Sequence, residues 1–304
     1  MARRIRIFGL VDIVFVADPT EIRALNDEPR IDRQFASRGP LVNRLICGQI
    51  TRWFKISGEF LPSLVSRRDQ VRAQRQGQLA AALDPACGRA LWSDVQLERL
   101  VSFVSGDGTN EDAAITVQEI VGRLFEPSYV ADLASWRAAI MIDRLRSGFS
   151  PIQIIWRIVG RLHRAHALLV ERANHDRWAM HGTAIGVHGI MQALARMRQL
   201  RALPDAMSVP DDTVLELCLQ APKQVPRTVD ATLSVPSVRG EIYPGTLVML
   251  QLEAARRLAP HGEMVFMQGH WNSCPARAFV IALLQAVWHR SLSGGEQRWR
   301  SKRR

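Results

Sequence analysis

Hydrophobic and polar residues along most of the chain alternate with the three-to-four-residue period of amphipathic helices. Strand patterns are fewer: residues 5–17 alternate and are rich in β-branched side chains, and residues 225–250 predict short strands separated by turns. The expected fold class is therefore mainly α with a minor β-sheet, in a single domain spanning residues 1–295. The predicted helices span residues 18–25, 67–83, 93–105, 113–125, 129–147, 151–172, 176–200, 211–219, 253–258 and 275–290.

Glycine and proline mark where this regular pattern breaks. Residues 30–66 carry them throughout and predict loops with short elements, and residues 262–273 predict a loop before the last helix. Within the longest predicted helix, Gly182, Gly186 and Gly189 each cost about 1 kcal/mol of helix stability relative to alanine. Close packing against another helix is the favoured explanation, and room for a flat ligand is the alternative.

Composition and charge narrow the function classes. With 304 residues, 47% hydrophobic and 23% charged, the chain can bury a large core. The net charge of +11 comes mostly from arginines spread singly among acids, so we do not expect a nucleic-acid partner. The dense basic run at the end follows Ser293-Gly294-Gly295, and we expect residues 296–304 to form a disordered, solvated tail rather than an RNA or membrane contact.

The cysteines and the N-terminal segment give evidence on the cellular compartment in which the protein is located. The four cysteines lie far apart without a CxxC pair, which argues against a disulfide framework or a cysteine-rich zinc site. Asp12 and Asp18 interrupt the apolar N-terminal run, so we expect a buried strand there rather than a signal peptide. No stretch reaches the roughly 20 apolar residues of a membrane span. A cytoplasmic location is the expectation.

Residues 266–279, just before and within the last predicted helix, contain the strongest candidates for a functional site. Cys274 occupies the expected N-cap, with Pro275 in the first turn, and the positive end of a helix favours a thiolate. Gly269 and the polar residues around it leave backbone N–H groups that can hydrogen-bond a metal-bound sulfur. The alternative is a buried, inert cysteine. A zinc site with His270 would need further ligands that no spaced set supplies.

This segment resembles the heme-binding loop of the cytochrome P450 superfamily, in which a cysteine follows Phe and Gly and opens a long helix near the C-terminus. The resemblance implies that Cys274 is the thiolate ligand of the iron of heme b, iron protoporphyrin IX. Phe266 and Gly269 each lie one residue too far upstream, and Asn272 and Ala276 replace the usual basic residue and glycine.

Other residues of the loop and of distant segments also resemble the family. His270 could supply the missing donor toward a heme propionate, and an exposed loop histidine is the alternative. Arg72 is similar to an arginine that contacts a propionate, and Arg227 matches an arginine that faces the heme. The family's Glu-x-x-Arg pair would fall at Glu216 and Leu219, so the arginine is absent. A heme-free binding or scaffold protein with this fold therefore remains an alternative.

The longest predicted helix resembles the oxygen-activating helix of the family, which usually carries an acid followed by a threonine. Thr183 is kept, whereas Gly182 stands in place of the acid. His181 or His188 could act instead as a proton donor near neutral pH, and packed histidines are the alternative.

The resemblance implies a shortened heme-thiolate oxidoreductase similar to a cytochrome P450 monooxygenase, with Thr183 and His181 as catalytic residues. It would act on a small apolar organic substrate and take electrons from a ferredoxin or a flavoprotein reductase. An enzyme that uses or rearranges hydroperoxides is the second heme hypothesis. The substrate pocket is not predicted: an apolar stripe at Met180, Ile185 and Met191 is more typical of a core.

Overall fold

The computed structural model describes residues 2–33, 38–88, 90–145, 151–238, 240–259 and 263–301. Its contacts divide the chain into two compact units. The first unit comprises residues 1–76, 144–159 and 221–274, and the second comprises residues 77–143, 160–220 and 275–304. A single domain over residues 1–295 therefore stays a prediction.

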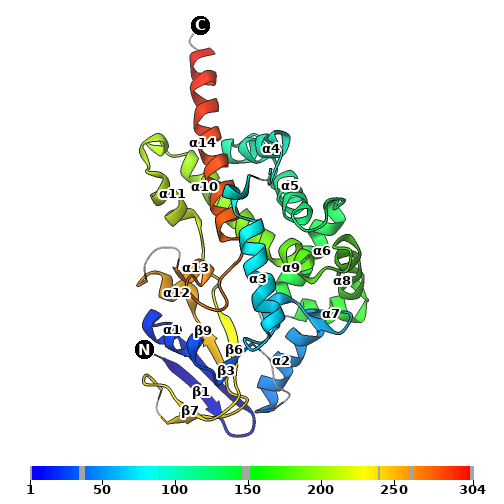
Figure 1. Cartoon of the computed structure of the whole chain (residues 1–304), viewed down its shortest axis with the longest axis vertical. Coiled ribbons are helices and arrows are strands. Elements are labelled where there is room, and N and C mark those ends of the chain that lie inside the picture. The colour runs from blue at the N-terminus through cyan, green and yellow to red at the C-terminus, as the bar shows by residue number, and fades with distance from the viewer. Residues whose placement is uncertain are drawn as a thin grey trace. The chain divides into compact units, whose positions relative to one another are not determined.

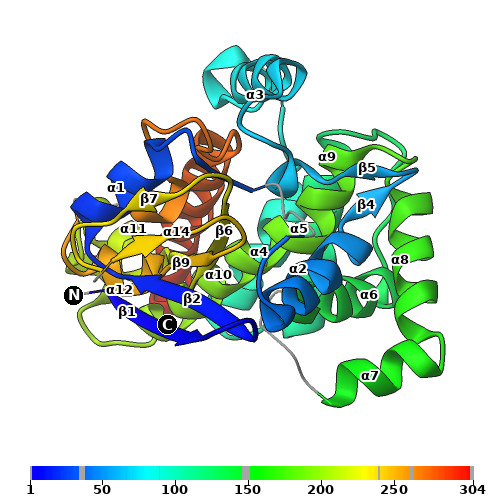
Figure 2. The same ribbon diagram turned by 90° about the horizontal axis from the view of Figure 1, so that it is seen from below.

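The first unit is built on a five-stranded sheet with the strand order β1-β2-β9-β6-β3 (Figures 1 and 2). β1 (Arg3–Ile7) and β2 (Val11–Val16) form an antiparallel hairpin, and β2 pairs in parallel with β9 (Leu247–Leu250). β9 pairs antiparallel with β6 (Val225–Val229), which in turn pairs antiparallel with β3 (Ile31–Asp32). The predicted strands are thus confirmed, and β1 lies at an edge of the sheet.

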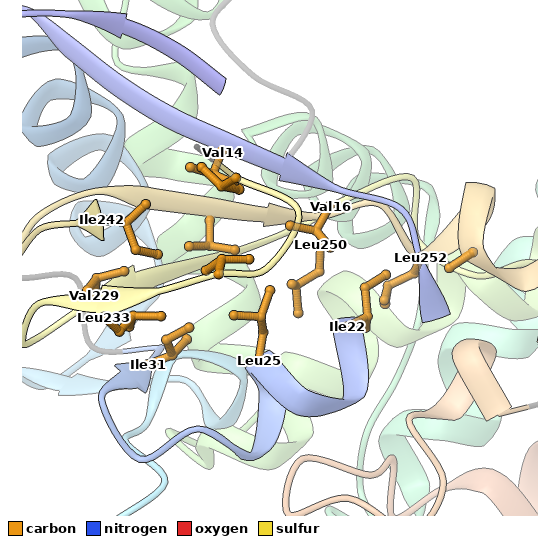
Figure 3. Close-up of a cluster of buried hydrophobic side chains, with 14 of the residues drawn as sticks. Val14, Val16, Ile22, Leu25, Ile31, Val229, Leu233, Ile242, Leu250 and Leu252 are labelled. Atoms are coloured by element: carbon orange, nitrogen blue, oxygen red, sulfur yellow. The ribbon is translucent and has the colours of Figure 1, made fainter. Parts of the chain in front are cut away.

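Alternation along the central strands places one face of the sheet against α1 (Pro19–Asp27). Val14 and Val16 on β2 are fully buried with Leu250 on β9, and Ile22 of α1 packs into the same cluster (Figure 3). The side chain of Asp18 caps α1 by accepting a hydrogen bond from the Glu21 N–H. The cap predicted from the sequence is confirmed, although the helix runs two residues beyond 25.

The first unit also contains a helix that the sequence pattern did not predict. α2 (Leu41–Trp53) lies within the segment expected to form loops. It begins after Pro40 without a side-chain cap and contains Gly48, so the usual start signal is missing and a breaker lies inside it. The prediction of residues 30–66 as loops is therefore wrong for this helix.

Short elements complete the first unit. Two-stranded ladders join β4 (Lys55–Ile56) to β5 (Glu59–Phe60) and β7 (Leu233–Ser234) to β8 (Glu241–Ile242). The helices are α7 (Pro151–Ile158), α12 (Leu252–Arg256) and α13 (Glu263–Phe266). α13 occupies the start of the segment predicted as a loop over 262–273. α3 (Gln70–Ala82) begins in the first unit and ends in the second.

The second unit is helical, and its elements follow the predicted pattern closely. α4 opens with a capping box between Ser93 and Gln96. The predicted helix over 151–172 is in fact two helices, because Gly160 adopts a left-handed backbone (φ 69°) between them. The helices of this unit are α4 (Asp94–Ser105), α5 (Asn110–Arg123), α6 (Leu133–Arg144), α8 (Arg161–Arg172), α9 (Arg177–His181), α10 (Val187–Arg201), α11 (Asp211–Cys218) and α14 (Arg277–Ser301).

The C-terminal helix corrects two predictions. α14 begins at Arg277, after a turn at residues 275–276, so Cys274 is not its N-cap. α14 also continues to Ser301, so residues 296–301 extend the helix rather than forming a disordered tail. Residues 296–300 include Glu, Gln and Arg, which are good helix formers. Residues 302–304 lie outside the described part of the chain.

No helix in the described part of the chain combines the length and apolar character needed to cross a membrane.

Candidate cofactor site

The loop from Phe266 to Cys274 is closed on itself by backbone hydrogen bonds. The N–H of Cys274 donates to the carbonyl of Phe266 at 2.9 Å, so the two ends of the loop lie side by side. Met267 and Gly269 adopt left-handed backbone conformations, with φ of 50° and 80°. Glycine tolerates this conformation without strain, so Gly269 fits its position in the turn. Cys274 lies exposed at the end of this loop.

Three consecutive carbonyls of this loop accept hydrogen bonds from side chains of the same unit. Arg72 Nη1 donates to the Trp271 carbonyl at 3.3 Å, and Arg33 Nη2 donates to the Asn272 carbonyl at 3.5 Å. Gln76 Nε2 donates to the Ser273 carbonyl at 2.7 Å. The segment that leads into the cysteine is therefore held by Arg33, which follows β3, and by the first half of α3.

The Trp271 ring is surrounded by guanidinium groups. Arg33, Arg72 and Arg67 lie over it, with their Cζ atoms 4.8, 5.0 and 5.5 Å from the ring centroid. The indole N–H donates to the Asn26 carbonyl at the end of α1 at 2.9 Å. Cation–π contacts of this kind orient the arginines as well as the ring. The cysteine loop and the arginines thus form one structural assembly.

Arg33, Arg72 and Arg227 form the arginine cluster, in which the three guanidinium groups share the nearby carboxylate of Asp32. Arg72 and Arg227 are 7% and 2% exposed, and Asp32 is 1% exposed. Asp32 already accepts hydrogen bonds from the Arg33 N–H, the Arg67 N–H and the Ser66 hydroxyl. Asp69, just before α3, also acts on the Arg72 guanidinium, so two carboxylates face three guanidinium groups and one positive charge remains in surplus.

The pKa values of the clustered arginines reflect this surplus of positive charge. Burial lowers the pKa of Arg33 well below its usual value, and the charges of Arg227 and Arg72 lower it further. Burial likewise lowers the pKa of Arg227 to about 10, against the opposing effect of Asp32. Among the described residues, Arg33 Nε and Arg227 Nε are shielded from solvent and have no hydrogen-bond acceptor. The arginine cluster is therefore short of negative charge and of acceptors.

These observations match the two carboxylates of heme b. Two propionates would supply the negative charge that the cluster lacks and acceptors for its unpaired N–H groups. Arg72 and Arg227, both singled out from the sequence, belong to the cluster. Arg33 was missed, because it lies in a segment predicted as loop and no motif marks it. The one signal for it is its neighbour Asp32, a charged residue at the end of a short strand.

His270 lies in the same unit as the arginine cluster, but its contacts are with carboxylates. Its Nδ1 lies 3.1 Å from Asp27 Oδ1, and its Nε2 lies 3.9 Å from Glu263 Oε1. Glu263 is itself paired with Arg23. Both ring nitrogens of His270 therefore face carboxylates, and its role toward a propionate stays a prediction.

The second unit contains the predicted catalytic residues in a distorted helix. Residues 182–186, between α9 and α10, form a π-helical turn. Thr183 is fully buried there, and its hydroxyl donates to the Ala179 carbonyl at 2.8 Å. The buried side chain of Gln118 on α5 donates to the Thr183 carbonyl at 3.1 Å and accepts from the Ser135 hydroxyl. π-helical turns of this kind often accompany functional sites.

Glycines at both ends of this turn differ in their surroundings. A Cβ on Gly182 would lie 2.9 Å from Val121 Cγ1 on α5, so close packing explains Gly182. A Cβ added to Gly186 or to Gly189 would meet no other heavy atom within 4 Å. His181 lies at the end of α9, whereas the His188 ring lies against Trp136 with centroids 4.9 Å apart and the ring planes tilted by 32°. The packed alternative therefore fits His188.

Other residues that the resemblance singled out are buried. Leu219, where the resemblance places a missing arginine, is 5% exposed at the end of α11. Met180, Ile185 and Met191 are at most 7% exposed and belong to the core of the second unit. The core interpretation of this apolar stripe is consistent with that burial.

Solved structures of cytochrome P450 proteins share this fold. The P450 enzyme CxnD, which forms a C–S bond in chuangxinmycin biosynthesis, matches with a TM-score of 0.57 at 11% identity, covering 91% of this chain and 79% of that chain. A six-coordinated P450 from Thermus thermophilus matches with a TM-score of 0.55 at 14% identity, covering 92% and 84%. P450BioI, in complex with a hexadecenoic acid-ligated acyl carrier protein, matches with a TM-score of 0.52 at 14% identity, covering 94% and 86%.

The chain therefore has a cytochrome P450-like fold, as the sequence predicts. No protein-family model matches it, and a search of curated proteins finds no match either.

Proposed function

We propose that this protein binds heme b through the thiolate of Cys274 and acts as a heme-thiolate oxidoreductase on a small apolar organic substrate. The observation that carries the proposal is the arginine cluster. Its surplus positive charge and its acceptor-less Nε groups call for an anionic ligand that accepts hydrogen bonds, and two of its members also hold the carbonyls of the cysteine loop. Heme, when bound, would supply the redox chemistry, which belongs to the cofactor.

The residues of the first unit would bind and orient this group. Arg33, Arg72 and Arg227 would pair with its propionates, and Trp271 would keep Arg33 and Arg72 in place by stacking. The Cys274 N–H donates to the Phe266 carbonyl, so a hydrogen bond within the loop supports the conformation that presents the sulfur. The cysteine would thus be preorganised for ligation.

The second unit would contribute a buried hydroxyl rather than an acid. The Thr183 Oγ1 can donate one hydrogen bond and accept others, and Gln118 holds the backbone carbonyl of the same residue. Gly182, packed on Val121, leaves no space for a carboxylate side chain at its own position. That packing favours the second candidate function, the use or rearrangement of organic hydroperoxides, because such substrates need no acid to deliver protons to dioxygen.

An apolar substrate agrees with the structures that share the fold. One of them holds a hexadecenoic acid-ligated acyl carrier protein and another holds myristic acid. If the protein is a monooxygenase, a ferredoxin or a flavoprotein reductase would supply its electrons. Turnover with surrogate reductases, set beside turnover with an organic hydroperoxide, separates the two candidate functions.

Thiol labelling tests the cofactor proposal directly. Burial raises the pKa of Cys47 to about 12 and that of Cys218 to about 11, so both should react slowly with a thiol reagent at about pH 8. Cys274 and Cys87 are exposed and should react fast. Loading with hemin should protect Cys274 and leave Cys87 reactive, with Cys274→Ala as the control that removes the protected thiol. Equal labelling of Cys274 with and without hemin would contradict the proposal.

A further inference from the structure

The turn of the β1–β2 hairpin carries apolar side chains that are unusually exposed. Phe8 at its tip is 94% exposed, and Ile7 beside it is 56% exposed. A large aromatic ring held in water at the tip of an edge hairpin has no role in the core of this unit. Exposed apolar groups that gather in one place mark contact surfaces rather than ordinary surface.

The start of α2 extends this surface. The N–H of Leu41 donates to the Gly9 carbonyl at 3.2 Å, and the N–H of Val42 donates to the Leu10 carbonyl at 2.8 Å. The first turn of α2 is thereby fixed beside the hairpin tip, as both views show (Figures 1 and 2). Leu41 and Leu45, four residues apart on one helix face, are 46% and 61% exposed. The hairpin patch is the set Ile5, Ile7, Phe8, Leu10, Leu41 and Leu45.

The strand and the helix that form the hairpin patch carry exposed charges of one sign, and Glu241, whose carbonyl accepts a hydrogen bond from Arg4, is an exposed acid beside β1. The strand and helix that form the patch contribute the exposed side chains of Arg3, Arg6 and Arg44, and Arg38 lies exposed just before α2. Residues 2–16 and 38–53 contain one acid, Asp12. Asp12 is buried and forms a bidentate pair with Arg4, so it does not offset the exposed arginines. The patch is apolar at its centre and cationic at its rim.

We propose that the hairpin patch docks the protein onto the surface of an anionic lipid bilayer. A convex apolar tip with a basic rim can insert its side chains at the boundary of headgroups and acyl chains while its arginines pair with lipid phosphates. A second copy of the chain fits less well, because pairing two β1 edges would bring rows of arginines together. This docking is independent of the cofactor and needs no membrane-spanning helix.

Vesicle flotation tests the docking. The wild-type protein should float with vesicles made of equal parts phosphatidylglycerol and phosphatidylcholine, and much less with pure phosphatidylcholine. Phe8→Ser should weaken vesicle binding by about tenfold or more, because it removes the apolar contact between the Phe8 ring and the acyl chains. Arg3→Gln with Arg44→Gln should weaken it by about fivefold for each charge removed. Added salt should weaken binding of the wild type.

Matched control variants distinguish vesicle binding by the hairpin patch from non-specific binding by other exposed residues. Leu258 is 75% exposed outside the patch, so Leu258→Ser should leave vesicle binding unchanged. Arg68→Gln with Arg75→Gln, on and beside α3, should have a smaller effect than the patch arginines. Thermal unfolding checks that each variant is folded, which the exposure of Phe8 leads us to expect.

Three results would overturn the proposal. The wild type could fail to bind either vesicle, or Phe8→Ser could bind as well as the wild type. Alternatively, the wild type could elute as a dimer that Phe8→Ser converts to a monomer, without vesicle binding, which would assign the patch to a second copy of the chain.

Discussion

The side-chain amide of Asn26, near the end of α1, donates to the side-chain oxygen of Asn272 at 3.1 Å across 246 residues of sequence. Both residues are buried, at 1% and 7% exposure. Through this contact Asn272 anchors the cysteine loop to α1. The Trp271 indole N–H donates to the carbonyl of the same Asn26, so one residue of α1 holds two residues of the loop.

Asn272→Ala should lower the free energy of unfolding by about 1–3 kcal/mol, because it leaves the buried amide of Asn26 without its acceptor. Urea unfolding followed by far-UV circular dichroism measures the change. Asn110→Ala, at an exposed position in the first turn of α5, should change the free energy of unfolding by less than about 0.5 kcal/mol. Equal losses in the two variants would show that the contact to Asn26 contributes nothing.

Arg33→Gln should have opposite effects on the apoprotein and on cofactor binding. Burial and the neighbouring arginines lower the pKa of Arg33, which means that its charge is unfavourable in the folded apoprotein. Removing that charge should leave the free energy of unfolding of the apoprotein unchanged or higher. The affinity for hemin should fall by about tenfold or more, since a charged hydrogen bond to a propionate is lost.

Hemin titration followed by quenching of tryptophan fluorescence gives the affinity, and urea unfolding without hemin gives the stability. Arg68→Gln, whose side chain is 66% exposed, is the matched control and should change neither quantity. An Arg33→Gln protein that is destabilised yet binds hemin normally would assign Arg33 a purely structural role.

Gly182→Ala and Gly186→Ala should differ in sign although they lie in the same turn of π-helix. A Cβ at residue 182 would approach Val121 to 2.9 Å, and a β-branched side chain in a packed helix cannot move away easily. We expect a loss of about 1–3 kcal/mol in the free energy of unfolding. At residue 186 a Cβ meets nothing within 4 Å, so alanine should stabilise the helix by up to about 1 kcal/mol. Chemical denaturation of both variants measures the difference, and a stabilising Gly182→Ala would contradict the packing explanation.

The sequence predicts most of the fold because strong local signals mark most elements. The Asp18 cap, the Ser93–Gln96 capping box and the alternation along β2 each specify a boundary or a face without help from distant residues. α2 escapes prediction because its start lacks a side-chain cap and its interior contains Gly48. The break at Gly160 escapes as well, since a left-handed glycine between two amphipathic patterns leaves the hydrophobic period intact.

The candidate site is less predictable because tertiary contacts create it. Arg72 and Arg227 were found through resemblance to the family, not through any pattern around them. Arg33 and Trp271 gain their roles only when β3, α3 and the cysteine loop come together. The partners of His270 are likewise distant in sequence, since Asp27 lies at the end of α1.

The central claim, that Cys274 is the thiolate ligand of a heme, is tested most directly by an absorption spectrum of hemin-loaded protein that is reduced and then exposed to carbon monoxide. The wild type should give the strongly red-shifted band of a thiolate-ligated heme, Cys274→Ala should lose it, and Cys87→Ala, which removes the other exposed thiol, should keep it. The same spectrum for wild type and Cys274→Ala, or no heme band in the wild type, would contradict the claim.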